Sequence, residues 1–196
     1  MAAPASALAQ AGGPLWLDAP LRQWNAAGGT VPTAPRRIEP FEGRCTGAER
    51  PPAGPEESAL AAAGWRMTDF WPSQRGGALV LVTAAAGYDG MCRPAWFNAF
   101  AFGGGRYAGT AAPQPMYPRE DGTLYDRPAI LAGGLVEATY LRYAATDPLC
   151  CPSLPATAVT YRLQSDAAGP VLLASRVAVA LRLPATGGGP AEEAGA

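Results

Sequence analysis

Four cysteines constrain the fold of this chain more than any other feature of its sequence. Cys150 and Cys151 are adjacent, and the other two are Cys45 and Cys92. An even set of cysteines is typical of proteins that work outside the reducing cytoplasm, where disulfides persist. We therefore expect an exported protein that is tied together by two disulfides.

The pairing of these cysteines is open, because four cysteines can be joined in three ways. Neighbouring side chains of an extended chain point to opposite sides, so we favour separate bonds from Cys150 and Cys151 to Cys45 and Cys92. The alternative is a bond between Cys150 and Cys151. Their Cα atoms would lie only ~3.8 Å apart, against roughly 4.4–6.8 Å in ordinary disulfides, which favours a strained and easily reduced bond. A zinc site made of all four cysteines is a third reading, although the usual Cys-x-x-Cys spacing is absent.

Histidine is absent from all 196 residues. This excludes Ser-His-Asp and Cys-His nucleophile systems and every zinc site that uses histidine. Gly103-Gly104-Gly105 is followed by Arg106-Tyr107 and not by the Gly-Lys-Ser/Thr of a phosphate loop. We therefore expect no cofactor and no metal, and we lean towards a protein that is not an enzyme.

Charge is sparse and scattered. The net charge is −1, and all 15 basic residues are arginines spread along the chain. Binding to a phosphate backbone needs a concentrated basic face, so we expect no nucleic-acid partner. No apolar run reaches the ~20 residues that a membrane span requires, so we expect no transmembrane span.

The N-terminal quarter is expected to be an arm on a larger domain. Residues 1–9 resemble the remnant of a secretory signal, because Ala7-Leu8-Ala9 before Gln10 matches a small-x-small cleavage site. An alanine-rich disordered leader is the alternative. Residues 10–56 form a Pro/Gly-rich arm in which Asp18 to Gly28 predicts one short helix, capped by Asp18 and ended by Gly28.

Residues 57–183 are expected to form the core domain, and residues 184–196, which lack an apolar anchor, a disordered tail. Pro55 to Gly64 predicts a second short helix with acidic residues in its first turn. The apolar run from Ala78 to Ala84 predicts a central strand. Three hairpins are expected around turns rich in glycine, with strands at 96–102 and 106–111, at 129–131 and 135–143, and at 158–164 and 171–183. The predicted fold is therefore α+β, with a single antiparallel meander sheet of about six or seven strands, two short N-terminal helices and disulfide ties.

The segment 114–127 is a candidate ligand-binding loop. It combines aromatic and charged side chains, a mixture that suits recognition of a polar ligand or peptide. The alternative is a solvated turn around Asp121-Gly122, in which the charges pair with one another. The candidate binding residues are Tyr117, Arg119, Glu120, Asp121 and Arg127.

Two further sites can be considered. Asp121 with Asp126, or Asp89 with Asp147, could form a carboxylate pair for acid–base hydrolysis, but Asp-Gly and Asp-Pro are ordinary turn sequences. The aromatic residues of the 96–102 strand favour a core strand that is buried on both faces. An apolar pocket for a lipid is the alternative.

The cysteine motifs carry a family resemblance. Asp89-Gly90-Met91-Cys92-Arg93-Pro94, Gly109-Thr110, the stretch from Pro115 to Gly122, and Arg142-Tyr143 with Asp147 to Ser153 resemble the LppP/LprE lipoprotein-like family of bacterial envelope proteins, over about residues 57–165. The resemblance implies an exported protein of the cell envelope and supplies no catalytic residues. Gln10 stands where a lipobox would have cysteine, so we expect an unanchored form.

Together these observations predict an exported, non-enzymatic envelope protein with a binding or structural role, in the periplasm or outside the cell. Its partner would be an envelope component or a small ligand. Two alternatives remain: a redox-responsive protein that uses Cys150-Cys151, and a carboxylate-based hydrolase.

Overall fold

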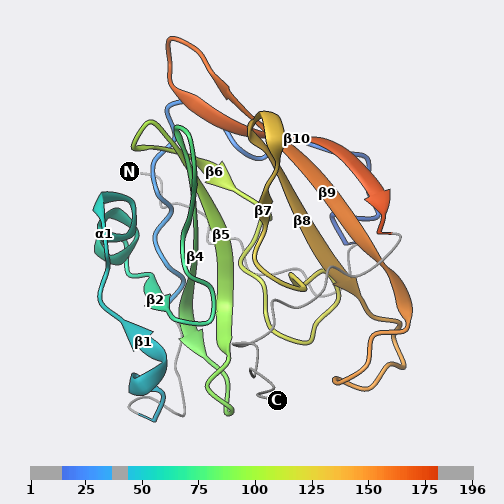
Figure 1. The fold of residues 1–196 in the computed structure, drawn as a ribbon. Helices are drawn as coiled ribbons and strands as arrows, with labels where there is room; N and C mark the ends of the chain where they lie inside the picture. The colour runs from blue at the N-terminus through green and yellow to red at the C-terminus, as the bar shows by residue number, and fades with distance from the viewer. Residues whose placement is uncertain (1–14, 37–43, 181–196) are drawn as a thin grey trace, which may run out of the picture.

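Two antiparallel sheets form most of the protein (Figure 1). The computed structural model describes residues 15–36 and 44–180. Within this part of the chain there is one α-helix, α1 (Pro55–Ala62), and two 3-10 helices, η1 (Thr46–Ala48) and η2 (Ala132–Gly134). The α+β class and the antiparallel pairing are confirmed, whereas the predictions of a single sheet and of two helices are wrong. The expected signal remnant, Gln10 and the 184–196 tail lie outside the described residues.

The first sheet has six strands in the described region. Their order is β1-β2-β4-β5-β6, and β3 also pairs with β4. As the apolar run from Ala78 to Ala84 predicts, β4 lies in the centre. The strands are β1 (Glu49–Arg50), β2 (Arg66–Thr68), β3 (Gln74–Gly76), β4 (Leu79–Tyr88), β5 (Pro94–Gly103) and β6 (Arg106–Thr110).

The second sheet has the order β10-β9-β8-β7. Its strands are β7 (Ala129–Ile130), β8 (Leu135–Arg142), β9 (Leu154–Ser165) and β10 (Pro170–Val179). The three predicted hairpins are confirmed as β5–β6, β7–β8 and β9–β10.

The long connection between β6 and β7 divides the strands into two sheets. It does not place β7 beside β6 in the same sheet. Instead it forms one isolated bridge with each of the two sheets. Met116 forms a bridge with Phe97 of β5, and Leu124 forms a bridge with Tyr140 of β8. The connection therefore carries the chain from one sheet to the other, and for this reason the single continuous meander was wrong.

The main hydrophobic core lies between the two sheets. In β8, Val136, Ala138 and Tyr140 are at most 1% exposed, while the intervening Glu137 is exposed. This alternation is the period of two that the sequence predicts for a half-buried strand. Phe97, Leu81, Val159 and Leu172 complete the cluster from the neighbouring strands.

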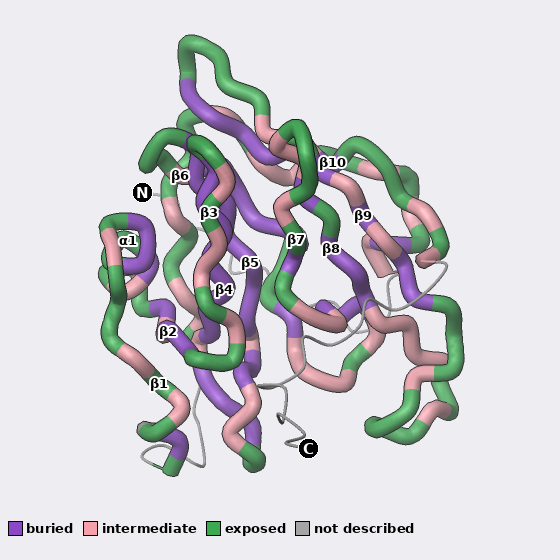
Figure 2. Tube along the Cα trace, viewed as in Figure 1, coloured by how far each residue is buried: buried purple, intermediate pink, exposed green. Residues whose placement is uncertain are grey.

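A second core cluster covers the outer face of the first sheet. Leu60 of α1 and Trp65 pack on Val80 and Val82 of β4 and on Phe100 of β5. The strands β4 and β5 are therefore buried on both faces, and Figure 2 shows that most of their residues are buried. This confirms the core interpretation of the aromatic strand for Phe97, Phe100 and Phe102.

Residues 15–36, which we call the strap, contain no helix, so the helix predicted from Asp18 to Gly28 is wrong. Side chains of the strap bind the backbone of distant strands. The Gln23 amide donates to Ala174 O at 2.7 Å and accepts from Ala174 N at 3.1 Å. The Trp24 indole donates to Thr110 O at 3.0 Å. These long-range bonds favour an extended strap over the local helix.

The helix predicted from Pro55 to Gly64 is confirmed as α1. Pro55 occupies its first position, where a missing N–H costs nothing. Glu57 accepts a hydrogen bond from Ala53 N at 2.7 Å, which holds the residue before the N-cap against the first turn, and it also pairs with Arg50 at 2.6 Å. Glu56 pairs with Arg75 at 2.8 Å, which ties α1 to β3.

Candidate functional site

Three connecting segments gather at one end of the two sheets, toward the bottom of Figure 1. They are the β4–β5 turn (89–93), part of the long connection (116–122) and the β8–β9 loop (143–153); we call this region the loop end. Two of them are bonded directly, because Tyr143 N donates to Asp121 Oδ1 at 2.8 Å. The Arg93 and Arg119 guanidinium groups lie close enough to act on the Tyr143 hydroxyl.

The β4–β5 turn is built around Asp89. This carboxylate accepts hydrogen bonds at 2.9 Å from the backbone of Met91 and of Arg93, and at 2.6 Å from Arg93 Nε. Burial favours the neutral acid, but these donors outweigh it and hold the pKa of Asp89 below its usual value. Met91 is left 70% exposed at the tip of the turn.

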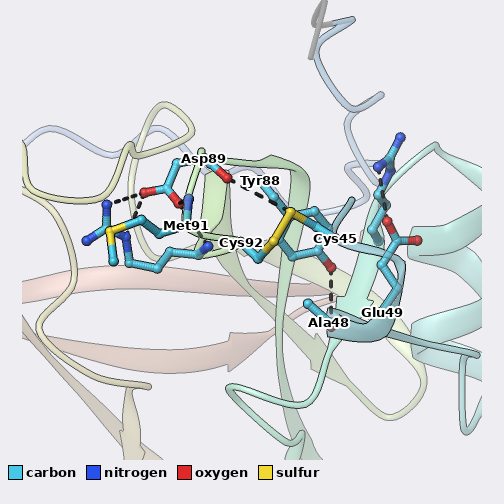
Figure 3. Close-up of a disulfide and its surroundings, with 9 residues drawn as sticks. Cys45, Ala48, Glu49, Tyr88, Asp89, Met91 and Cys92 are labelled. Carbon is cyan, nitrogen blue, oxygen red and sulfur yellow. Dashed lines mark hydrogen bonds and ion pairs between the residues drawn. A yellow bond between two sulfur atoms is a disulfide. The ribbon is translucent and has the colours of Figure 1, made fainter. Parts of the chain in front are cut away.

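A disulfide ties this turn to the segment before β1. Cys45 and Cys92 are bonded to each other, with their Cα atoms 5.2 Å apart, and Figure 3 shows the bond beside Tyr88 and Asp89. Tyr88 donates from its hydroxyl to Ala48 O at 3.4 Å, which holds the same two segments together. The bond closes a sequence separation of 47 residues.

The other two cysteines, Cys150 and Cys151, are bonded to each other. The preferred pairing of these residues with Cys45 and Cys92 is therefore wrong. Cys45 and Cys92 join the segment before β1 to the β4–β5 turn of the first sheet, whereas Cys150 and Cys151 lie in the loop that follows β8 of the second sheet. Both are exposed, and their turn is closed by a bond from Cys151 N to Pro148 O at 2.9 Å.

Asp147 organises the β8–β9 loop. Its Oδ2 accepts hydrogen bonds from Ala144 N, Ser153 N and Ser153 Oγ, at 2.7–3.0 Å. The bonds from Ser153, followed by that from Ala144, lower the pKa of Asp147. The Tyr143 hydroxyl donates to Leu149 O at 3.3 Å, which closes the loop from the other side.

The predicted binding residues Tyr117, Arg119 and Asp121 have different contacts in the structure. Tyr117 packs edge-on against Trp96, with ring centroids 5.1 Å apart. Arg119 lies at the loop end beside Tyr143. Asp121 pairs with Arg142 at 2.9 Å, and Arg142 also pairs with Asp18 of the strap at 2.8 Å. Asp121 is therefore occupied in holding the strap and the loop end together.

The other two predicted binding residues are on the surface, and the carboxylates predicted for hydrolysis do not pair with one another. Glu120 and Arg127 are exposed, and Asp126 accepts a bond from the adjacent Arg127 N at 2.6 Å. Asp89 and Asp147 are each enclosed by donors of their own turn. The carboxylates proposed for acid–base chemistry are thus held separately, each by a different set of donors.

Left-handed backbone conformations mark the loop end. Within the described residues three non-glycine residues have positive φ: Cys92 at 59°, Trp96 at 49° and Arg119 at 64°. Cys92 and Arg119 belong to its segments, and Trp96 contacts it through Tyr117. Such conformations cost of order 1–3 kcal/mol each and concentrate at functional sites.

Sequence reasoning missed three residues at this end, namely Arg93, Trp96 and Tyr143. Trp96 was assigned to the core strand, although it is only half-buried. Arg93 and Tyr143 stand inside the motifs that carry the family resemblance, Cys92-Arg93-Pro94 and Arg142-Tyr143. Those motifs were therefore the available signal for both residues.

Two hollows open on the surface of the described residues. One of about 380 Å³ lies between the strap and the first sheet, where Trp24, Trp65 and Tyr107 line it. A shallower one of about 530 Å³ lies beside the Cys45–Cys92 bond and Phe70. No group of three metal-ligating side chains occurs in the described residues. In the same part of the chain, no helix has the length and apolar character for crossing a membrane.

The fold and site define a two-sheet antiparallel domain with a disulfide-bonded end made of loops. Residues 74–166 match the family model described as LppP/LprE lipoprotein. The resemblance seen in the sequence is therefore confirmed over these residues. The match indicates an envelope protein of unspecified role, and it contains all three segments of the loop end. No curated protein and no solved structure matches the chain.

Proposed function

We propose that this is an exported, non-enzymatic envelope protein that binds a ligand bearing a carboxylate or phosphate group at the loop end. The observation that carries the proposal is the state of Arg119. It is half-buried, has a left-handed backbone and lies close enough to the Tyr143 hydroxyl to act on it electrostatically, yet it forms no ion pair with a carboxylate among the described residues.

The neighbouring arginines differ in this respect. Arg93 is paired with Asp89, and Arg142 with Asp121 and Asp18. A guanidinium group binds carboxylate and phosphate through two parallel hydrogen bonds. The ring pair of Trp96 and Tyr117 supplies an adjacent amphipathic surface of the kind that binding sites favour. Arg119 is thus the loop-end cation with capacity for an external anion.

The engagement of the carboxylates supports a binding role over hydrolysis. Asp89 and Asp147 have lowered pKa values because of their donors, so both stay ionised at neutral pH and cannot act as general acids. Asp121 is committed to Arg142. The disulfides and the envelope family support an exported location, in the periplasm or outside the cell.

The test is a titration of the full oxidised chain, followed by tryptophan fluorescence at constant ionic strength. Glycerol 3-phosphate and glucuronate supply the two anionic groups, and glycerol is the uncharged comparison. The variant Arg119→Gly removes the guanidinium and suits the positive φ, so it should keep or raise the melting temperature. Arg176→Gly, at an exposed position of β10, is the matched control.

We expect saturable binding of at least one anion by the native chain and none of glycerol. Arg119→Gly should weaken that binding by about tenfold or more, because a hydrogen bond to a charged group contributes ~1.5–3 kcal/mol. Arg176→Gly should bind as the native chain does. Equal binding by the two variants, or no saturable response to either anion, would overturn the proposal.

A further inference from the structure

We propose that the Cys150–Cys151 bond is a thiol–disulfide exchange site, which an external dithiol opens reversibly while Cys45–Cys92 stays closed. Neither the family match nor the anion-binding proposal assigns this chemistry. The inference depends on the contrast between the two disulfides and on the loop that holds the adjacent pair.

Access is the first difference between the two bonds. Exchange begins when a thiolate attacks one sulfur of the disulfide, so its rate depends on access to that sulfur. Cys150 and Cys151 are both exposed. Cys45 is 6% exposed and Cys92 is half-buried. A dithiol in solution therefore reaches the adjacent pair first.

Adjacency is the second difference. Consecutive residues fix the Cα separation at 3.8 Å, which is shorter than the roughly 4.4–6.8 Å span of ordinary disulfides. The bond also closes no loop beyond its own ring, so it restricts the unfolded chain very little. The Cys45–Cys92 bond closes a separation of 47 residues. Opening the adjacent pair should therefore leave the fold intact.

The loop around the pair is held without help from the sulfur atoms. Asp147 Oδ2 binds Ala144 N and both donors of Ser153, and the Tyr143 hydroxyl binds Leu149 O. These bonds persist when the disulfide opens. The two thiols then stay next to each other, which allows the bond to form again.

The reaction balances as a two-electron exchange. A thiolate of the external dithiol attacks Sγ of one cysteine, the bond between the two cysteines breaks, and the other cysteine leaves as a thiolate that takes up a proton. The second thiolate of the dithiol then attacks the dithiol sulfur of this mixed disulfide and releases the first cysteine as a thiolate, which also takes up a proton. Two electrons and two protons pass to Cys150 and Cys151, and the dithiol becomes a disulfide.

The test uses the oxidised full chain, graded concentrations of dithiothreitol, and N-ethylmaleimide to trap free thiols before tryptic mapping. Cleavage after Arg142 and Arg162 releases both adjacent cysteines on one peptide, 143–162, which holds no other cysteine. We expect this peptide to carry no label and no cross-link before reduction. It should gain two labels at a dithiothreitol concentration about tenfold below that which labels Cys45 and Cys92.

Two controls accompany the test. The partly reduced chain should keep the melting temperature of the oxidised chain. When dithiothreitol is removed and glutathione disulfide is added before N-ethylmaleimide, peptide 143–162 should again carry no label. The variant Cys150→Ser/Cys151→Ser should fold and should reduce at Cys45–Cys92 as the native chain does. A cross-link from peptide 143–162 to Cys45 or Cys92, labelling without reductant, or simultaneous reduction of all four cysteines would each overturn the proposal. Because the readout is labelling, it is independent of anion binding.

Discussion

The side-chain amide of Asn25 lies in the space that a side chain at Gly109 would occupy. A Cβ atom on Gly109 would overlap the Asn25 side-chain amide. From this position the Asn25 amide binds both backbone groups of Thr110 in β6 and the carbonyl of Leu172 in β10, each at 2.9 Å. Because β6 and β10 are edge strands of different sheets, one strap side chain satisfies backbone groups of both.

We expect Gly109→Ala to displace the strap and lower the free energy of unfolding by about 2–4 kcal/mol, through steric overlap and lost hydrogen bonds. Gly104→Ala is the matched control, because Gly104 also has positive φ but has open space where its Cβ would be. That variant should lose only the ~1–2 kcal/mol of the left-handed conformation. Denaturant titration followed by tryptophan fluorescence measures both. Equal losses would show that the strap does not depend on this contact.

The strap also shows where sequence reasoning stops. Asp18 to Gly28 has a capping residue, a proline in its first turn and a terminal glycine, and these local signals favoured a helix. The structure is extended because Gln23 binds Ala174, which is 151 residues away, and Asn25 binds Thr110, which is 85 residues away. Contacts between residues so far apart in the sequence cannot be predicted from local sequence patterns.

The strands were predictable because their signals are local. The alternation of Val136, Ala138 and Tyr140 reflects one buried face, and the apolar run of β4 reflects two. The division into two sheets was not predictable, because it depends on where Met116 and Leu124 pair.

The candidate site was predictable only in part. Tyr117 and Arg119 could be nominated from their mixture of ring and charge. The residues around them come from β5, the β4–β5 turn and the end of β8, which only the fold brings together. The positive φ of Trp96 and Arg119 cannot be predicted from the sequence, because tryptophan and arginine residues rarely adopt it.

Alkaline unfolding should depend on the buried pair of Tyr140 and Tyr161. Their hydroxyl groups lie 2.7 Å apart, and the Tyr140 hydroxyl is 2.6 Å from Ala111 O. Burial raises the pKa of both phenols. The folded protein therefore retains protons that the unfolded chain releases near pH 10, and its stability should fall as pH rises above that value, by up to about 1.4 kcal/mol per pH unit for each phenol.

Tyrosinate absorbance during an alkaline titration measures this effect. The signal from Tyr140 and Tyr161 should appear only with unfolding, and Tyr140→Phe/Tyr161→Phe should show a shallower loss of stability above pH 10. Ionisation of both phenols in a chain that is still folded would contradict the expectation.

Acid should weaken the protein through Glu57. This side chain is 4% exposed, and its hydrogen bond with Arg50, aided by that from Ala53, lowers its pKa from 4.5 to about 2 against the effect of burial. Because the folded-state pKa is the lower one, the stabilisation is present above pH 4.5 and is lost as pH falls towards 2. Glu57→Gln should lower stability at neutral pH by about 3 kcal/mol, since it leaves Arg50 without this partner, and should flatten the acid dependence.

The control for Glu57 is Glu49→Gln. Glu49 pairs with Arg66 at 3.0 Å, but both side chains are about a third exposed. Exposed pairs contribute ~0–1 kcal/mol, so this variant should lose much less stability at neutral pH. Thermal melts from pH 2 to pH 7 distinguish the two variants, and the prediction fails if they lose the same amount.

Of the two disulfides, Cys45–Cys92 should contribute more to the free energy of unfolding. A bond that closes a loop of this length restricts the unfolded chain by about 4 kcal/mol, whereas a bond between neighbours restricts it very little. We therefore expect Cys45→Ser/Cys92→Ser to lower the free energy of unfolding by several kcal/mol, to about the extent given by that loop entropy. Cys150→Ser/Cys151→Ser should change it much less. Denaturant titrations of both double variants, with the oxidised native chain as reference, measure the difference. A larger loss in the second variant would mean that the β8–β9 loop, and not the segment before β1, depends most on its disulfide.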